Sequence, residues 1–119
     1  MKTHALVMVD AAGVIRVWSP GAEALFGYDE ASAVGQTLDL IVPEDYRGRH
    51  WAGFRAAASS GTTKMDEPVA NIPITCQDGS VVRFPGRLMV LRDAKNKIIG
   101  AMGIFTASAG ADDNGLPNI

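Results

Sequence analysis

Three β-prone segments separated by two polar turns fill the second half of the sequence, and this pattern constrains the fold more than any other feature. The segments cover Glu67–Cys76, Ser80–Leu91 and Ile98–Ala107. The Asp78–Gly79 pair is a strong hairpin signal, and the longer polar stretch Arg92–Lys97 forms the second connection. Strands joined by short hairpins pair antiparallel. The sequence therefore predicts an antiparallel sheet.

The middle segment contains Pro85 and Gly86, which interrupt its pattern. A proline removes a ladder donor, and a glycine leaves room for another group. Two explanations stay open at this point, a β-bulge or a close approach by another part of the molecule.

A further hairpin and short helices are expected in the first half. Ala5–Val9 and Val14–Trp18 are β-prone and flank a turn that ends at Gly13. Ser19 then fits a helix N-cap with proline after it, and Gly27 ends this short helix. Together with the predicted antiparallel strands, these short helices indicate an α+β fold.

The longest helix is expected at Glu44–Ser60. Pro43 precedes it, acids occupy its first turn, and Gly61 follows its end. Spacings of three and four residues place Tyr46 and His50 on one helix face, which we expect to point inward.

Composition excludes several classes of protein. With 119 residues the chain has room for one domain, which we expect at 1–109, followed by a flexible tail at 110–119. A net charge of −2 with dispersed basic residues gives no nucleic-acid surface. Apolar runs are too short for a membrane span or a signal peptide, and the single cysteine forms no metal-type spacing. We therefore expect a cytoplasmic location.

The order of these segments resembles the PAS sensor domains over nearly the whole chain. The resemblance is carried by the residues of the first hairpin and helix, by the stretch before the long helix, and by the later hairpin turn: Asp10, Gly13, Ile15, Trp18, Ser19, Pro20, Ala22, Leu25, Phe26, Gly27, Tyr28, Val34, Gly35, Leu40–Glu44 and Asp78–Gly79. It implies a five-stranded antiparallel sheet in the order 2-1-5-4-3, with short helices and one longer helix covering one face.

The stretch Pro43–His50 resembles the haem-binding PAS domains of the rhizobial oxygen-sensor kinases and of the enteric direct oxygen sensor. The register continues without a gap to Gly61 and to the Asp78–Gly79 turn. This resemblance makes His50 the candidate iron ligand for haem b. A neutral imidazole is a good axial ligand, and a haem needs apolar walls around it.

The rest of the predicted haem site surrounds His50. Tyr46 shares its helix face, while Arg55 and Lys64 are candidates for pairing with the haem propionates. Four apolar residues are candidates for the pocket wall: Phe54, Leu88, Met89 and Ile104.

The sequence departs from these oxygen sensors where the gas would bind. The position of the kinases' distal arginine corresponds to Ala70, and that of the enteric sensor's methionine ligand to Pro68. The resemblance therefore implies a weaker hold on O2, so that CO, NO or redox state is favoured as the signal. Met65, Asn71, Thr75 or Met89 would replace these groups only if the strand were shifted or bent.

Three functions are compatible with these observations. The first is a haem-based sensor of a diatomic gas or of redox state that signals to a partner protein. The second is a cofactor-free PAS module that binds a small organic ligand or mediates dimerisation. The third is a small stand-alone haem enzyme, whereas no set of nucleophile, base and orienting group supports a non-haem enzyme. A homodimer and a signalling effector are the expected partners, with no nucleic acid and no membrane.

Overall fold

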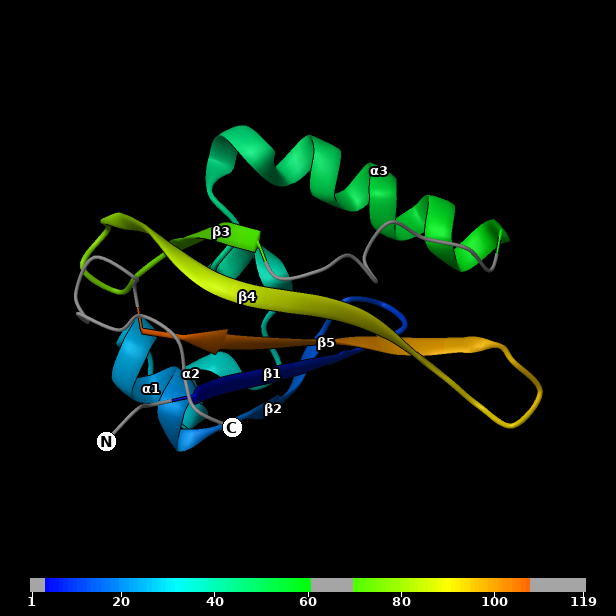
Figure 1. Ribbon diagram of the computed structural model, residues 1–119, viewed down its shortest axis with the longest axis horizontal. Coiled ribbons are helices and arrows are strands. Elements are labelled where there is room, and N and C mark those ends of the chain that lie inside the picture. Colours follow the sequence, from blue (N-terminus) through cyan, green and yellow to red (C-terminus); the bar gives the residue numbers. More distant parts are fainter. Residues whose placement is uncertain (1–3, 61–69, 108–119) are drawn as a thin grey trace.

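A computed structural model describes residues 4–60 and 70–107, leaving aside the side chains of residues 53–60 and 70. Its sheet confirms the predicted antiparallel arrangement, with the strand order β2-β1-β5-β4-β3 (Figure 1). The strands are β1 (His4–Asp10), β2 (Ile15–Trp18), β3 (Ala70–Thr75), β4 (Val81–Arg92) and β5 (Ile98–Thr106).

The described part of the chain between β2 and β3 contains four helical segments. They are α1 (Pro20–Phe26), α2 (Glu30–Ala33), the 3-10 helix η1 (Leu38–Leu40) and α3 (Glu44–Ser60). Figure 1 shows α3 along the side of the molecule occupied by β3 and β4, whereas α1 and α2 lie near β1 and β2. None of the helices in the described ranges has the length and apolar character that crossing a membrane requires. The expected tail at 110–119 lies outside the described residues.

Ser19 connects the first helix to the sheet. Its Oγ accepts a hydrogen bond of 3.2 Å from the backbone N–H of Ala22, as an N-cap does, and one of 2.8 Å from the N–H of Leu6 in β1. The helix ends at Gly27, whose φ of +96° is a left-handed conformation. The sequence signals at both ends of α1 are therefore confirmed.

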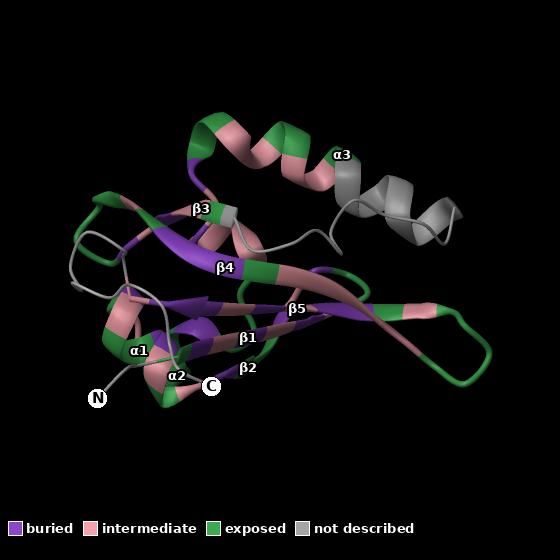
Figure 2. Cartoon of the chain, viewed as in Figure 1, coloured by how far each residue is buried: buried purple, intermediate pink, exposed green. Residues whose placement is uncertain are grey.

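Aromatic rings from four elements meet in the core. The ring of Phe26 in α1 lies 5.8 Å from that of Trp18, 5.1 Å from that of Phe84 and 5.4 Å from that of Phe105, each in an edge-to-face arrangement. Edge-to-face pairs add about 0.5–1.5 kcal/mol beyond the area that they bury. This cluster joins α1 to β2, β4 and β5, and Figure 2 shows buried stretches on β4 and β5.

The interruption at Pro85 and Gly86 has a structural explanation. The strand stays in register with β3 there, because Asn71 pairs with Pro85 and Ala70 with Gly86. A Cβ atom built on Gly86 would come within 2.5 Å of the Phe105 ring. Of the two explanations left open by the sequence, the close approach is correct, and the irregularity of β4 occurs later, between Leu91 and Arg92.

Replacing Phe26 by alanine should lower the free energy of unfolding by about 3–5 kcal/mol, because it removes the ring on which three others pack. Urea denaturation followed by circular dichroism measures this loss. The matched control is Val81→Ala, since Val81 is 54% exposed, and its stability should change by no more than about 0.5 kcal/mol. Equal losses in the two variants would contradict the central role of Phe26.

A cavity between the sheet and the long helix

An apolar cavity of about 370 Å³ lies between the sheet and the chain segment from η1 into α3. This volume falls within the range of roughly 300–1,000 Å³ that small-molecule sites occupy. The lining residues come from β1, from the η1–α3 segment and from β3, β4 and β5: Val7, Val9, Leu38, Ile41, Val42, Pro43, Tyr46, Arg49, His50, Ile72, Pro73, Ile74, Leu88, Ala101, Met102, Gly103 and Phe105.

The long helix supplies the polar side chains of this lining, which are Tyr46, Arg49 and His50. Their spacing of three and four residues places them on one face of α3. The helix begins directly after the buried Pro43 and carries two acidic residues in its first turn. Their negative charges interact favourably with the positive end of the helix dipole. The helix start signals in the sequence thus fix where α3 begins, and its packing over the sheet brings this face to the cavity.

His50 is half-buried at the cavity wall. Burial lowers the pKa of its imidazole below the ordinary 6.5, and the negative charge of Asp39 opposes this shift without cancelling it. The ring also packs against Trp51, with 4.8 Å between the ring centroids and an edge-to-face angle of 75°. The site therefore holds His50 mainly as a neutral imidazole near neutral pH.

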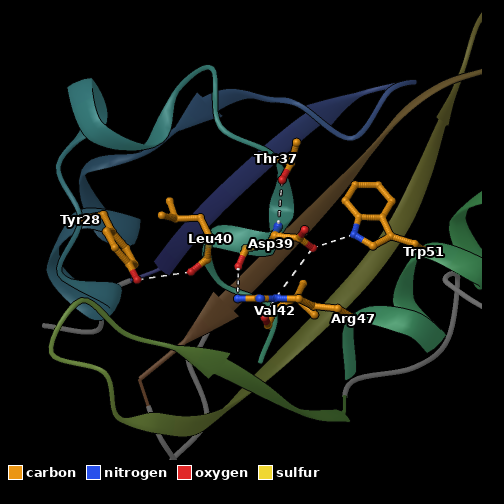
Figure 3. Close-up of polar contacts among 7 residues, drawn as sticks. All are labelled: Tyr28, Thr37, Asp39, Leu40, Val42, Arg47 and Trp51. Carbon is orange, nitrogen blue, oxygen red and sulfur yellow. Dashed lines mark hydrogen bonds and ion pairs between the residues drawn. The ribbon is translucent and has the colours of Figure 1, made fainter. Parts of the chain in front are cut away.

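A polar network connects α3 to η1, as Figure 3 shows. The Trp51 indole Nε1 donates a hydrogen bond of 2.6 Å to the Asp39 carboxylate. The guanidinium of Arg47 donates to the carbonyl oxygens of Asp39 and Val42, each at 3.1 Å, and lies 4.0 Å from the same carboxylate. These contacts position the helix turn that carries His50.

Trp51 also covers the β1–β2 turn at Gly13. This glycine has a φ of +82°, and a Cβ atom built on it would collide with the Trp51 ring. Both the backbone conformation and the indole thus require glycine here. The Gly13 that carries the hairpin signal in the sequence is therefore also a packing site for the long helix.

The opposite wall of the cavity is made by the sheet. Leu88 of β4 and the small residues Ala101 and Gly103 of β5 face the interior. A Cβ atom at Gly103 would come within 2.7 Å of the Phe105 ring and 3.1 Å of Leu88. Small residues at this wall leave room for aromatic packing and for the cavity.

The structure places some of the predicted site residues at this cavity and others elsewhere. Tyr46, His50 and Leu88 line it. Met89 and Ile104 are not among the lining residues, although their chain neighbours Leu88 and Gly103 are. Contacts of Met89 and Ile104 with a haem stay predictions.

Four further predicted residues have no described side chain. Phe54 and Arg55 lie in α3, and Ala70 begins β3 opposite Gly86. Lys64 lies outside the described residues. In the part of the chain that the structure describes, no three His, Cys, Asp or Glu side chains gather as a site for a bare metal ion.

Two arginines that the sequence reasoning did not select lie at the cavity rim. Arg49 lines the cavity, and its position three residues after Tyr46 was a usable signal. Arg83 donates a hydrogen bond of 3.2 Å to the Tyr46 hydroxyl. No local sequence pattern predicts the contact between Arg83 and Tyr46, because the two residues are 37 positions apart in the sequence.

An antiparallel sheet and a set of helices that enclose an apolar cavity define a small α+β domain with room for a ligand. The chain belongs to the PAS fold family, whose sequence profile matches residues 3–107. A crystal structure of a PAS domain from Colwellia psychrerythraea superimposes with a TM-score of 0.71, covering 86% of this chain and 83% of that one. The sequence identity is 22%, so this likeness concerns the fold.

Two curated relatives are sensor proteins by name. The chain is 41% identical over 46 residues to the sensor protein FixL of Bradyrhizobium diazoefficiens, covering 39% of this chain and 9% of FixL. It is 24% identical over 76 residues to the oxygen sensor protein DosP of Escherichia coli, covering 64% of this chain and 10% of DosP. The chain therefore spans only a small part of the length of these relatives.

Replacing Trp51 by phenylalanine should loosen the start of α3, because it removes both the hydrogen bond to Asp39 and the distal indole atoms that lie over Gly13. We expect the free energy of unfolding to fall by about 1–2 kcal/mol and amide hydrogen exchange to accelerate at residues 44–52. Arg16→Gln is a suitable control, since it breaks only the exposed ion pair with Asp10. Unchanged exchange in α3 would argue against a role of Trp51 in positioning the helix.

The stability of the ligand-free protein should fall as the pH drops below about 6.5, in part because of His50. The unfolded chain takes up a proton at its ordinary pKa, whereas the folded chain resists protonation at this buried ring. His50→Gln removes this contribution, so its stability should decline less between pH of about 7.5 and 5.5. Denaturant titrations of both proteins provide the test, and identical pH dependence would count against a lowered pKa.

Proposed function

We propose that this PAS domain is a haem-binding sensor module, with haem b in the cavity and His50 as the axial ligand of the iron. The supporting observation is an imidazole on the wall of an otherwise largely apolar cavity. Only an unprotonated imidazole nitrogen coordinates a metal. Burial lowers the pKa of His50 and so favours this form near neutral pH.

The residues present fit the requirements of a haem. One axial ligand from the protein is enough, because the porphyrin supplies the equatorial ligands. Apolar side chains such as Ile72, Ile74 and Leu88 would contact the macrocycle and exclude water. Contacts of Phe54, Arg55 and Lys64 with the haem stay predictions.

Bound haem would supply a redox-active iron able to take a diatomic gas. The role of the protein would be to hold and orient the His50 ring, which the Trp51 indole contacts at its edge. A displacement of His50 would reach η1 through the hydrogen bond from Trp51 to Asp39. This path offers a physical link between the cavity and the rest of the fold.

The cavity residues of β3 bear on which gas or redox signal the domain would detect. These residues are Ile72, Pro73 and Ile74, whose side chains carry no hydrogen-bond donor. A donor is what holds O2 most effectively in a haem pocket. Although DosP is an oxygen sensor by name, we favour CO, NO or redox state as the signal for this chain.

The proposed role requires a recipient for the signal. We propose a single sensing domain at residues 1–109, acting in the cytoplasm as a homodimer and signalling to an effector protein. The small share of FixL and DosP that the chain spans fits a module that works together with other domains. A cofactor-free module with a small organic ligand is the second candidate, since the size of the cavity also suits such a ligand.

Hemin titration should give the wild-type protein a sharp Soret band that shifts when the reduced protein is exposed to CO. His50→Ala should weaken hemin binding by on the order of tenfold or more, because it removes the axial bond, and added imidazole should restore the spectrum. The control is His4→Ala, since His4 is exposed in β1, and it should behave like the wild type.

Two results would contradict the haem proposal. One is a wild-type protein without a defined Soret band after hemin addition. The other is a His50→Ala spectrum and affinity equal to those of the wild type. In the first case, mass spectrometry of molecules retained by the purified protein would test the organic-ligand alternative.

A further inference from the structure

Tyr46 lies between two guanidinium groups at the rim of the cavity. The Cζ atom of Arg49 is 4.9 Å from the centroid of the tyrosine ring, in a cation–π contact. From β4, Arg83 donates one hydrogen bond of 3.2 Å to the Tyr46 hydroxyl and another of 3.2 Å to the Asn71 carbonyl oxygen. Three side chains from two distant segments therefore form one cluster.

Within residues 4–60 and 70–107, no carboxylate compensates the positive charges of this cluster. Among the described residues, neither Arg49 nor Arg83 forms an ion pair with a carboxylate. Arg16 and Arg47 differ in this respect, since they face Asp10 and Asp39 at 2.9 Å and 4.0 Å. Although the chain has a net charge of −2, its described part thus places two arginines without a carboxylate partner next to Tyr46 at the cavity.

The tyrosine hydroxyl adds a hydrogen-bond donor to this site. Because its oxygen accepts the bond from Arg83, its own O–H is available to donate elsewhere. Tyr46 and Arg49 both line the cavity, so a ligand inside it can reach both groups. A guanidinium beside a hydroxyl donor is a good match for a carboxylate.

We propose that the cavity binds an amphipathic carboxylic acid, with its apolar body among the sheet residues and its carboxylate on Arg49 and the Tyr46 hydroxyl. Arg83 is a positioning residue, because it holds the tyrosine rather than lining the cavity. This inference deepens the proposed function, since haem carries two propionate carboxylates. A free long-chain acid has the same chemistry, with a single carboxylate.

The test compares each acid with a neutral analogue of the same body. Hemin is paired with hemin dimethyl ester, and decanoate with decan-1-ol, in binding titrations with wild type, Arg49→Gln, Arg49→Lys and Arg87→Gln. Arg87 is the matched control, because it is an exposed arginine on β4 that does not line the cavity. Circular dichroism verifies that each variant is folded.

At least one acid should bind to the wild type more tightly than its neutral analogue. Arg49→Gln should weaken binding of that acid by about fivefold, the scale of a partly exposed charge pair, and leave the neutral analogue unaffected. Arg49→Lys should retain part of the preference, and Arg87→Gln all of it.

The outcomes separate this inference from the haem proposal. If decanoate shows the Arg49 dependence while hemin gives no defined Soret band, the carboxylate site stands and the haem proposal fails. If hemin binds through His50, but the wild type prefers hemin over its dimethyl ester no more than Arg49→Gln does, the haem proposal stands and the carboxylate site is overturned. Equal losses in Arg49→Gln and Arg87→Gln, or no binding of either acid, also overturn it.

Discussion

The position of α3 over the cavity depends on the hydrogen bond of 2.6 Å between the Trp51 indole and the Asp39 carboxylate. A bond to a charged acceptor contributes about 1.5–3 kcal/mol, more than a neutral one. It connects the long helix to η1, and the same indole closes over Gly13 in the first hairpin. This connection positions His50, the residue before Trp51, at the cavity wall.

A cavity of this kind links ligand binding to stability. Side chains that face an empty apolar space lose packing contacts that a filled core would provide. A ligand that binds only the folded chain restores such contacts and raises stability by mass action. The fold can accommodate this space because the aromatic cluster around Phe26, whose Phe105 ring also lines the cavity, packs α1 firmly against the sheet.

Much of the fold was predictable from local signals. The helix Glu44–Ser60 is found with its expected bounds, and β4 at Val81–Arg92 differs by one residue at each end from the expected strand. At the site, the helix spacing correctly brought Tyr46 and His50 to one face. The wall was harder to predict, because choosing Met89 and Ile104 required knowing which face of each strand is covered, and the apolar run Leu88–Leu91 shows no alternation.

By itself the sequence determined the bounds of the long helix and, to within about a residue, those of β1, β2 and β4, since caps, turns and glycines act over a few residues. Its PAS resemblance indicated the strand order. Only the tertiary structure decided which strand residues face the cavity, that the Phe105 ring occupies the space beside Gly86, and that Arg83 meets Tyr46. These contacts join residues far apart in the chain. They depend on strand register and on side-chain packing, which no local pattern encodes.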